Sequence, residues 1–181
     1  MMKIKLFLSL GLASILLWNC SNMSERKVVK TDDKLINQRE GGTISLKLAE
    51  AGCYIDVTEP SNNTAEWNVN IKKTGRYKVW LSSATKDTIN LNYSHSIKVN
   101  LPDSELVVIP KCDIILKDSQ DVTFPYFRAD SYIGSFYISD PGEYNIQVVS
   151  DKVISKSAGN KTSSPSDNSK LMAVILSPMT N

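Results

Sequence analysis

Apolar and polar residues alternate along most of the chain from Thr43 onward. The segment AEWNVNIKKTGRYKVWL, 65–81, shows this pattern on both sides of a Lys-Thr-Gly turn. Side chains of a strand point alternately to opposite faces, so the segment predicts two strands, joined by a hairpin or by a tight sheet-to-sheet connection, whose apolar faces share one core. The expected core positions are Trp67, Val69, Ile71, Tyr77, Val79 and Leu81. Trp80 is out of phase and is expected on the opposite face of its sheet, either covered by a loop or partly exposed.

Short runs with the same period of two fill the rest of this region. They are TISLKL, CYIDV, TINLNY, SIKVNL, ELVVI, CDIIL, YIGSFYI, EYNIQVV and KLMAVILS, separated by turn-forming clusters such as EPSNN, LPDS and SDPG. No segment shows the apolar stripe with a period near 3.6 residues that an amphipathic helix requires. The pattern therefore predicts an all-β fold, an antiparallel β-sandwich formed by residues 43–181 around one core.

The N-terminal residues MMKIKLFLSLGLASILLWNC have the order of an export signal: two lysines, an apolar run over 6–18, and then Cys20. That run is too short to cross a bilayer comfortably. The residues LLWNC resemble the lipobox of bacterial lipoproteins, in the form found in gut Bacteroidota, which implies a signal peptide over 1–19 and lipidation of Cys20. An ordinary signal peptide and an uncleaved anchor are the alternatives. Ser21 is not the aspartate linked to inner-membrane retention, so we expect the outer membrane of the cell envelope, on either its periplasmic or its surface face.

Residues 20–42 are polar and lack an apolar period, so they predict the lipidated cysteine followed by a flexible tether. An amphipathic helix is the alternative, but it would have only Val28, Val29, Leu35 and Ile36 to bury. The tether would connect the lipid to the sandwich domain.

The charge of the mature chain excludes one class of partner. Removal of residues 1–19 would take away Lys3 and Lys5, which leaves 19 basic residues against 19 acidic ones. A formally neutral protein lacks the concentrated basic field that nucleic-acid binding requires. We therefore expect no nucleic-acid partner, and membrane attachment through the lipid rather than through charge.

Three segments, AEWNVNIKKTGRYKVWL, YIGSFYISDPGEYNIQVVS and LMAVILSP, carry a common set of turn and core positions. These positions are Trp67, Gly75, Tyr77, Val79, Leu81, Gly134, Phe136, Ile138, Gly142, Tyr144, Leu176 and Pro178. Together they resemble the galactose-binding-like jelly rolls of carbohydrate-binding modules, including modules appended to bacterial α-L-fucosidases. The resemblance specifies fold better than function, because nearly all of these positions lie in the core or in turns.

Carbohydrate-binding modules often hold sugars on aromatic side chains with polar groups beside them, and the segment DVTFPYFRADSY, 121–132, offers both. It breaks the strand pattern and so predicts an aromatic loop. The predicted ligand-binding residues are Phe124, Tyr126, Arg128 and Asp130, together with Trp80. The alternative is that Phe124 and Phe127 close one end of the sandwich while Arg128 pairs with Asp130.

The resemblance also bears on metal binding and on the cysteines. Glu50 matches a glutamate that helps to bind a structural calcium in some of these modules, but the usual acidic partner is missing from the terminal strand, so a solvated turn residue is the alternative. No other cofactor is expected. Cys53 and Cys112 remain after lipidation of Cys20, and export permits a disulfide between them, with two separate thiols as the alternative.

Few arrangements of catalytic residues are available to this chain. His95 is the sole histidine, which excludes a histidine-rich metal site, and its segment NYSHSIK contains no nucleophile elbow. Acidic residues are plentiful, but no pattern selects the pair that glycoside hydrolysis needs. We therefore expect a lipid-anchored, non-catalytic protein that binds a glycan or serves as an accessory protein in glycan handling. The alternative is a structural or protein-binding envelope lipoprotein without a sugar site.

Overall fold

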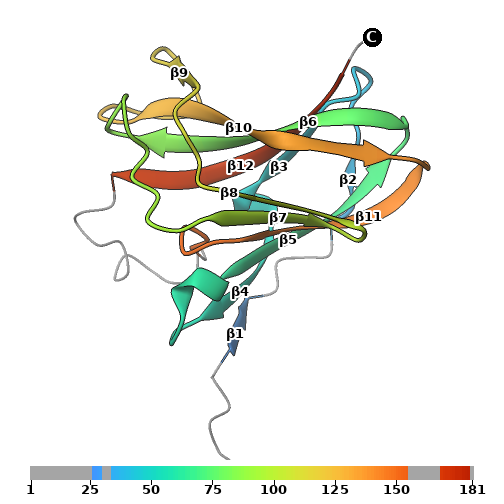
Figure 1. Cartoon of the computed structure of the whole chain (residues 1–181), viewed down its shortest axis with the longest axis horizontal. Helices are drawn as coiled ribbons and strands as arrows, with labels where there is room; N and C mark the ends of the chain where they lie inside the picture. The colour runs from blue at the N-terminus through green and yellow to red at the C-terminus, as the bar shows by residue number, and fades with distance from the viewer. Residues whose placement is uncertain (1–25, 30–33, 155–167, 180–181) are drawn as a thin grey trace, which may run out of the picture.

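The computed structural model describes residues 26–29, 34–154 and 168–179, so the predicted signal peptide and Cys20 lie outside the described residues. Within these ranges the chain is an antiparallel β-sandwich of two sheets packed face to face, as predicted (Figure 1). Besides strands, the described ranges contain two short 3₁₀ turns, η1 (Leu48–Glu50) and η2 (Pro60–Asn62). No helix in this part of the chain is long and apolar enough to cross a membrane.

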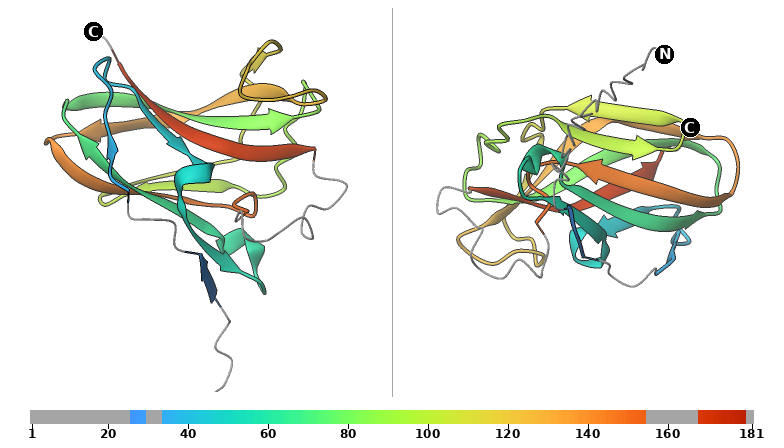
Figure 2. Two further views of the ribbon diagram at one scale, coloured as in Figure 1. Left: turned by 180° about the vertical axis from the view of Figure 1, so that it is seen from behind. Right: turned by 90° about the horizontal axis from the view of Figure 1, so that it is seen from below.

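The two sheets are called sheet A and sheet B. Sheet A has the strand order β1-β4-β5-β11-β7-β8, with β2 beside β5, and sheet B has the order β3-β12-β6-β10-β9 (Figure 2). The strands of sheet A are β1 (Arg26–Val29), β2 (Ile36–Asn37), β4 (Gly52–Asp56), β5 (Thr64–Ile71), β7 (Ile97–Leu101), β8 (Ser104–Val108) and β11 (Gly142–Val149). Those of sheet B are β3 (Ile44–Lys47), β6 (Gly75–Thr85), β9 (Ile114–Leu116), β10 (Phe127–Ile138) and β12 (Ser169–Pro178). Among the described strands only β2 and β5 pair in parallel.

β5 and β6 contain the segment that predicted a shared core. Because β5 belongs to sheet A and β6 to sheet B, the Lys-Thr-Gly turn is a sheet-to-sheet connection rather than a hairpin. Trp67 and Tyr77 lie in the core between the sheets, with exposed fractions of 3% and 1%. The Trp67 indole Nε1 donates a hydrogen bond of 2.9 Å to the carbonyl of Lys47, which joins β5 to β3 in the opposite sheet. Gly75 has a φ of 127°, a conformation that only glycine adopts readily.

The folded domain begins before Thr43, so the prediction of a flexible tether up to residue 42 is wrong in this part. β1 pairs with β4, and β2 pairs with β5. Gln38, which follows β2, is buried, and its amide oxygen accepts hydrogen bonds from the Lys72 and Lys73 amides at 2.8 and 2.9 Å. Its amide nitrogen donates to the Tyr77 hydroxyl at 2.7 Å, and that hydroxyl donates to the Lys73 carbonyl at 2.6 Å. One glutamine from the N-terminal segment thus holds the β5–β6 connection closed.

The run TINLNY, 88–93, was expected to be a strand and is a loop. The Asp87 carboxylate accepts hydrogen bonds from the amides of Ile89 and Asn90 at 2.8 and 3.1 Å, and these bonds lower the pKa of Asp87. Asn92 has a φ of 51°, which no extended strand contains. Local hydrogen bonds from asparagine and aspartate side chains therefore override the alternating pattern here.

β10 begins at Phe127, earlier than its alternation predicted, so only the first part of the segment 121–132 is a loop. The strand contains a bulge between Tyr132 and Gly134, where the pairing with β6 shifts by one residue. Gly134 has a φ of 139°, and a Cβ atom there would lie 2.8 Å from Leu106 Cδ2 of β8. A larger residue here would therefore be strained by its φ and would also require the Leu106 side chain to shift.

The bonds of the Tyr77 hydroxyl predict a specific loss of stability. Tyr77→Phe removes the partner of the Lys73 carbonyl and one of the two partners of Gln38 Nε2, the other being the Gly42 carbonyl. We therefore expect the free energy of unfolding to fall by about 1–3 kcal/mol. Tyr137→Phe, which changes an exposed tyrosine of the same sheet, should change it by less than about 0.5 kcal/mol. Urea unfolding followed by tryptophan fluorescence measures both, and equal stabilities of the two variants would contradict the role of this hydroxyl.

Candidate functional site

The outward-facing side of sheet B, called the B face, carries most of the predicted site residues. Because paired residues of adjacent antiparallel strands point to the same side, the register places these side chains in rows about 7 Å apart. One row is Ser45, Ile175, Trp80 and Tyr132; the next is Lys47, Ala173, Ser82, Asp130 and Ile114; the third is Lys170, Ala84, Arg128 and Leu116. Trp80 is therefore on the opposite face from Tyr77, as predicted, and is partly exposed.

A groove of about 650 Å³ runs over the B face. Its floor is formed by small or aliphatic side chains of β6 and β12, namely Ser82, Ala173 and Ile175. One wall contains Arg128 and Asp121, and the opposite wall contains Arg39, Lys47 and the turn η1. Small residues on a flat strand floor leave open space, so the depth of the groove comes from the longer side chains at its two walls.

Arg128 is held in place by two carboxylates. Its Nε and Nη2 donate to the two oxygens of Asp130 at 2.9 and 3.0 Å, and its Nη1 donates to Asp121 Oδ2 at 2.6 Å. The hydrogen bonds to Asp130 raise the pKa of Arg128 further above its usual range, and Asp121 adds to this effect. A bidentate pair fixes the plane of the guanidinium. The pairing of Arg128 with Asp130, which the sequence left as an alternative, is therefore present, and both residues still face the groove side of sheet B.

Tyr126 lies beyond the groove, in a neighbouring hollow of about 370 Å³. The two hollows share Asp121, Leu171 and Met172 in their linings. The ammonium groups of Lys86 and Lys170 lie 5.2 and 5.4 Å from the centre of the Tyr126 ring. Cations at this distance are attracted by the electron-rich face of the ring.

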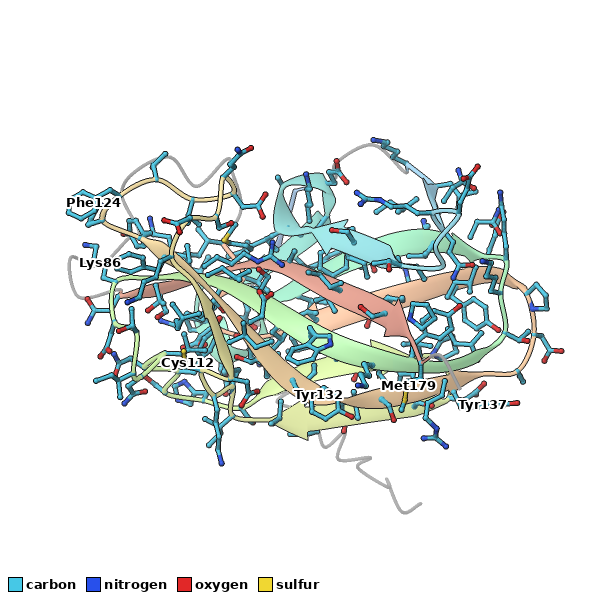
Figure 3. The ribbon with its side chains drawn as sticks, turned by 90° about the horizontal axis from the view of Figure 1, so that it is seen from above. Lys86, Cys112, Phe124, Tyr132, Tyr137 and Met179 are labelled. Carbon is cyan, nitrogen blue, oxygen red and sulfur yellow. The ribbon has the colours of Figure 1, made fainter. Side chains whose placement is uncertain are left out.

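Phe124 does not close the end of the sandwich. Its side chain is 90% exposed and projects from the loop before β10, at the corner of the B face where Lys86 also lies (Figure 3). Tyr132 lies nearer the middle of this face and Tyr137 at its other end (Figure 3). The predicted residues thus share one face of the molecule, but they do not form a single aromatic platform.

Two residues that the sequence analysis did not select extend the site. Tyr132 is 45% exposed, and its ring centre lies 5.3 Å from that of Trp80 at an interplanar angle of 57°. Asp121 completes the cage around Arg128. Tyr132 has the same parity as Arg128 and Asp130, so recognition of β10 as a strand from Phe127 would have identified it.

The outer face of sheet A is polar in a different way, because its side chains bond mainly to one another. Asn145 Nδ2 donates to Asn68 Oδ1 at 3.1 Å, and the Tyr54 hydroxyl donates to Glu66 Oε1 at 2.6 Å. Gln147 Nε2 donates to the other oxygen of Glu66 at 3.3 Å. These cross-strand pairs stabilise the sheet and leave fewer groups for a ligand than the B face does.

Cys53 and Cys112 are both free thiols, so the predicted disulfide is wrong. Cys53 is buried on β4 of sheet A, with its Sγ 3.9 Å from the Ala51 carbonyl. Cys112 lies between β8 and β9, where its Sγ donates to the Thr88 carbonyl at 3.4 Å. The sequence could permit the pair but carried no information on its distance.

Glu50 and His95 are both exposed. Glu50 lies in η1, and the described residues contain no group of three or more His, Cys, Asp and Glu side chains that could hold a metal ion. His95 Nδ1 lies 3.3 Å from Asp151 Oδ2. Neither residue lines the B-face groove.

No protein-family model matches the chain, and no curated protein matches it. Solved structures do. An α-L-fucosidase from Vibrio sp. strain EJY3 matches with a TM-score of 0.59 and 18% identity over 80% of this chain and 24% of the fucosidase. The chain thus spans about a quarter of the length of that enzyme, and the expected likeness to a part of an α-L-fucosidase is confirmed at the level of fold.

Two further matches have TM-scores below 0.5 and add nothing to the assignment of the fold. The Podospora anserina GH26-CBM35 β-(1,4)-mannanase has a TM-score of 0.45 and 11% identity over 78% of this chain and 29% of its own. The Cry4Aa toxin of Bacillus thuringiensis has a TM-score of 0.48 and 10% identity over 81% of this chain and 25% of its own.

The free cysteines generate a prediction for chemical labelling. Burial, and then the negative charges of Asp113 and Asp87, raise the pKa of Cys112, and burial raises the pKa of Cys53. Since the thiolate is the reactive form, iodoacetamide should label Cys112 in the native protein slowly near neutral pH and faster as the pH rises above the usual thiol range. Asp113→Asn should speed this labelling several-fold at a fixed pH. Cys53 should react only after unfolding.

Peptide mass mapping assigns each label, and Cys112→Ser is the control that should lose the native one. The free thiols would be contradicted if protein unfolded without any reductant were labelled at neither Cys53 nor Cys112.

Proposed function

We propose that this chain is a non-catalytic carbohydrate-binding protein whose glycan lies in the B-face groove. The observation that carries the proposal is the combination, on one face, of an open groove, a guanidinium held rigid by two aspartates, and the exposed ring pair of Trp80 and Tyr132. A groove on a flat sheet suits an extended chain of sugars better than a small compact ligand. The fold shared with part of an α-L-fucosidase supports a glycan-related role.

The groups on the B face match the chemistry of a sugar ring. Asp121 and Asp130 take one hydrogen from each guanidinium nitrogen of Arg128, which leaves a second hydrogen on each Nη for a ligand hydroxyl. Ile175 lines the groove, and Trp80 lies next to it in the register, beside the groove, where an aromatic face can pack against the C–H side of a sugar. The guanidinium would therefore orient a sugar that the aromatic rings hold.

The lining of the groove supports binding without catalysis. Among the described residues that line it, Asp121 is the carboxylate, and its Oδ2 is already bonded to Arg128. Glycoside hydrolysis requires two carboxylates on opposite sides of the bond to be cleaved. A single paired aspartate can hold a hydroxyl but cannot supply both roles.

The alternative role, binding of another protein, is favoured by one observation. Ile114 and Leu116 of the edge strand β9 face outward in the same rows as Asp130 and Arg128, with exposed fractions of 43% and 39%. An apolar strip of this kind beside an edge strand is typical of a protein contact. It lies next to the groove and would be the surface used if no glycan binds.

We further propose that the domain is attached to the outer membrane through a lipid on Cys20. Cys20 precedes β1 by six residues, so the sandwich would lie close to the bilayer surface. Acyl chains contribute about 0.8 kcal/mol for each buried methylene, so two or three chains hold a protein firmly.

Binding of glycans tests the first proposal. The purified chain should be retarded in an affinity gel that contains at least one polysaccharide of a broad panel. Trp80→Ala and Tyr132→Ala should each weaken binding to that polysaccharide by about tenfold. Tyr137→Ala, at the other end of the same face, is the matched control and should bind as the wild type does. A broad glycan panel without retention, or variants that bind as well as the wild type, would refute the proposal. Turnover of chromogenic glycosides would refute its non-catalytic part.

Detergent partitioning tests the anchor. The wild-type chain expressed in a bacterium that processes lipoproteins should enter the detergent phase of Triton X-114 and carry the mass of the acyl chains. Cys20→Ala has no thiol to acylate, so its mass should include no acyl chains. A wild-type chain that has been cleaved but not acylated would instead identify an ordinary signal peptide.

A further inference from the structure

Lys86, Tyr126 and Lys170 form a cationic cluster next to the B-face groove, called here the Tyr126 corner. Both ammonium groups lie over the same ring, at 5.2 and 5.4 Å from its centre, so they can be no more than about 10.6 Å apart. Two cations beside one ring repel each other, and an anion that contacts both lowers this repulsion. The corner is therefore suited to a negatively charged group.

The backbone fixes the positions from which these lysines extend. Lys170 pairs with Ala84 in the register of β12 and β6, and the Lys86 amide donates to the Asn168 carbonyl at 2.9 Å. One residue further in, the buried Ser169 Oγ donates to Thr85 Oγ1 at 2.9 Å. Lys170 thus extends from β12 and Lys86 from the residue that follows β6, where hydrogen bonds still join the two segments.

The hollow at the Tyr126 corner lies next to the groove, because Asp121, Leu171 and Met172 line both. A polymer in the groove would therefore reach the corner by passing over the Arg128–Asp121 pair. On the far wall of the groove, Arg39 and Lys47 are two more cations. Positive groups therefore lie at both ends of these two neighbouring hollows, an arrangement that suits a chain with repeated negative charges.

The described carboxylates leave most of the cations on this path without an ion-pair partner. Within the described residues, no carboxylate forms an ion pair with Lys86, Lys170, Arg39 or Lys47, whereas Arg128 already has two aspartate partners. The outer face of sheet A carries Glu66 and Glu143 on neighbouring strands, together with the exposed Lys98.

We propose that the glycan bound by the B face is an acidic polysaccharide, with a carboxylate or sulfate group held between Lys86 and Lys170. This inference rests on the proposed carbohydrate-binding function and specifies its ligand class. Each exposed ion pair contributes little by itself, so affinity requires several charges of one polymer to engage at once. A charged monosaccharide should therefore compete poorly with the polymer.

Matched polymers test the proposal. Polygalacturonate and its fully methyl-esterified form share a backbone and differ in charge, and chondroitin sulfate and its desulfated form differ in sulfate. We expect the wild-type chain to bind at least one acidic polymer ten times or more tightly than its less charged counterpart, with affinity that falls as the NaCl concentration rises. Which pair shows the difference identifies the group as carboxylate or sulfate.

Variants locate the site. Lys86→Gln together with Lys170→Gln should weaken binding of the acidic polymer by ten times or more, since both exposed side chains keep their length and lose their charge. Lys98→Gln, an exposed lysine on the outer face of sheet A, is the matched control and should leave binding unchanged. Thermal unfolding of the double variant at the wild-type temperature verifies that its fold is intact.

Four outcomes would overturn the proposal. Equal binding of each acidic polymer and its less charged form would leave the carbohydrate-binding function intact but refute the acidic ligand. Binding that the double variant retains in full would refute the Tyr126 corner as the site. Binding to phosphatidylglycerol vesicles that depends on Lys86 and Lys170, without binding to either acidic polymer, would assign the corner to a lipid surface. Retention on no glycan at all would refute the proposed function itself.

Discussion

The alternation of β6 determines which side chains the molecule presents. Every second residue of β6 faces the core. Because β6 lies between β12 and β10, the residues of both neighbours that pair with these core residues also face the core. Tyr77, Val79 and Leu81 take the inner side, which leaves Trp80 and Ser82 on the outer side. Since register then sets the orientation of β10, Arg128, Asp130 and Tyr132 must all face outward. The B face is thus a direct consequence of core packing on the opposite side of the same strands.

The sequence predicted the sandwich and its central core because both depend on local alternation, which is visible in a single chain. Trp67 and Tyr77 are buried where their parity placed them. The prediction was wrong where single side chains decide the structure. Gln38 has no periodic neighbours, yet its hydrogen bonds fix the β5–β6 connection, and the carboxylate of Asp87 turns an alternating run into a loop. Such bonds depend on the precise position of one polar atom, which no pattern of hydrophobicity records.

The candidate site was predicted in part for the same reason. Arg128, Asp130 and Trp80 share a face, which parity could supply once the strands were known. The groove walls, and the approach of Lys86 and Lys170 to one ring, depend on the pairing of β6 with β12, strands that are far apart in the chain. The predicted disulfide was wrong through a related limitation, because Cys53 and Cys112 could be counted but not located.

The hydrogen bonds of Gln38 also determine how mechanical load would enter the domain. A pull on the N-terminal side of the chain meets β1 and β2 in sheet A before it reaches β3, the first strand of sheet B. Gln38 lies between β2 and β3 in the chain and is hydrogen-bonded to the β5–β6 connection, which links the two sheets. Tension from the N-terminal end would therefore act first on the hydrogen bonds of Gln38. The B face would keep its shape until those bonds had broken.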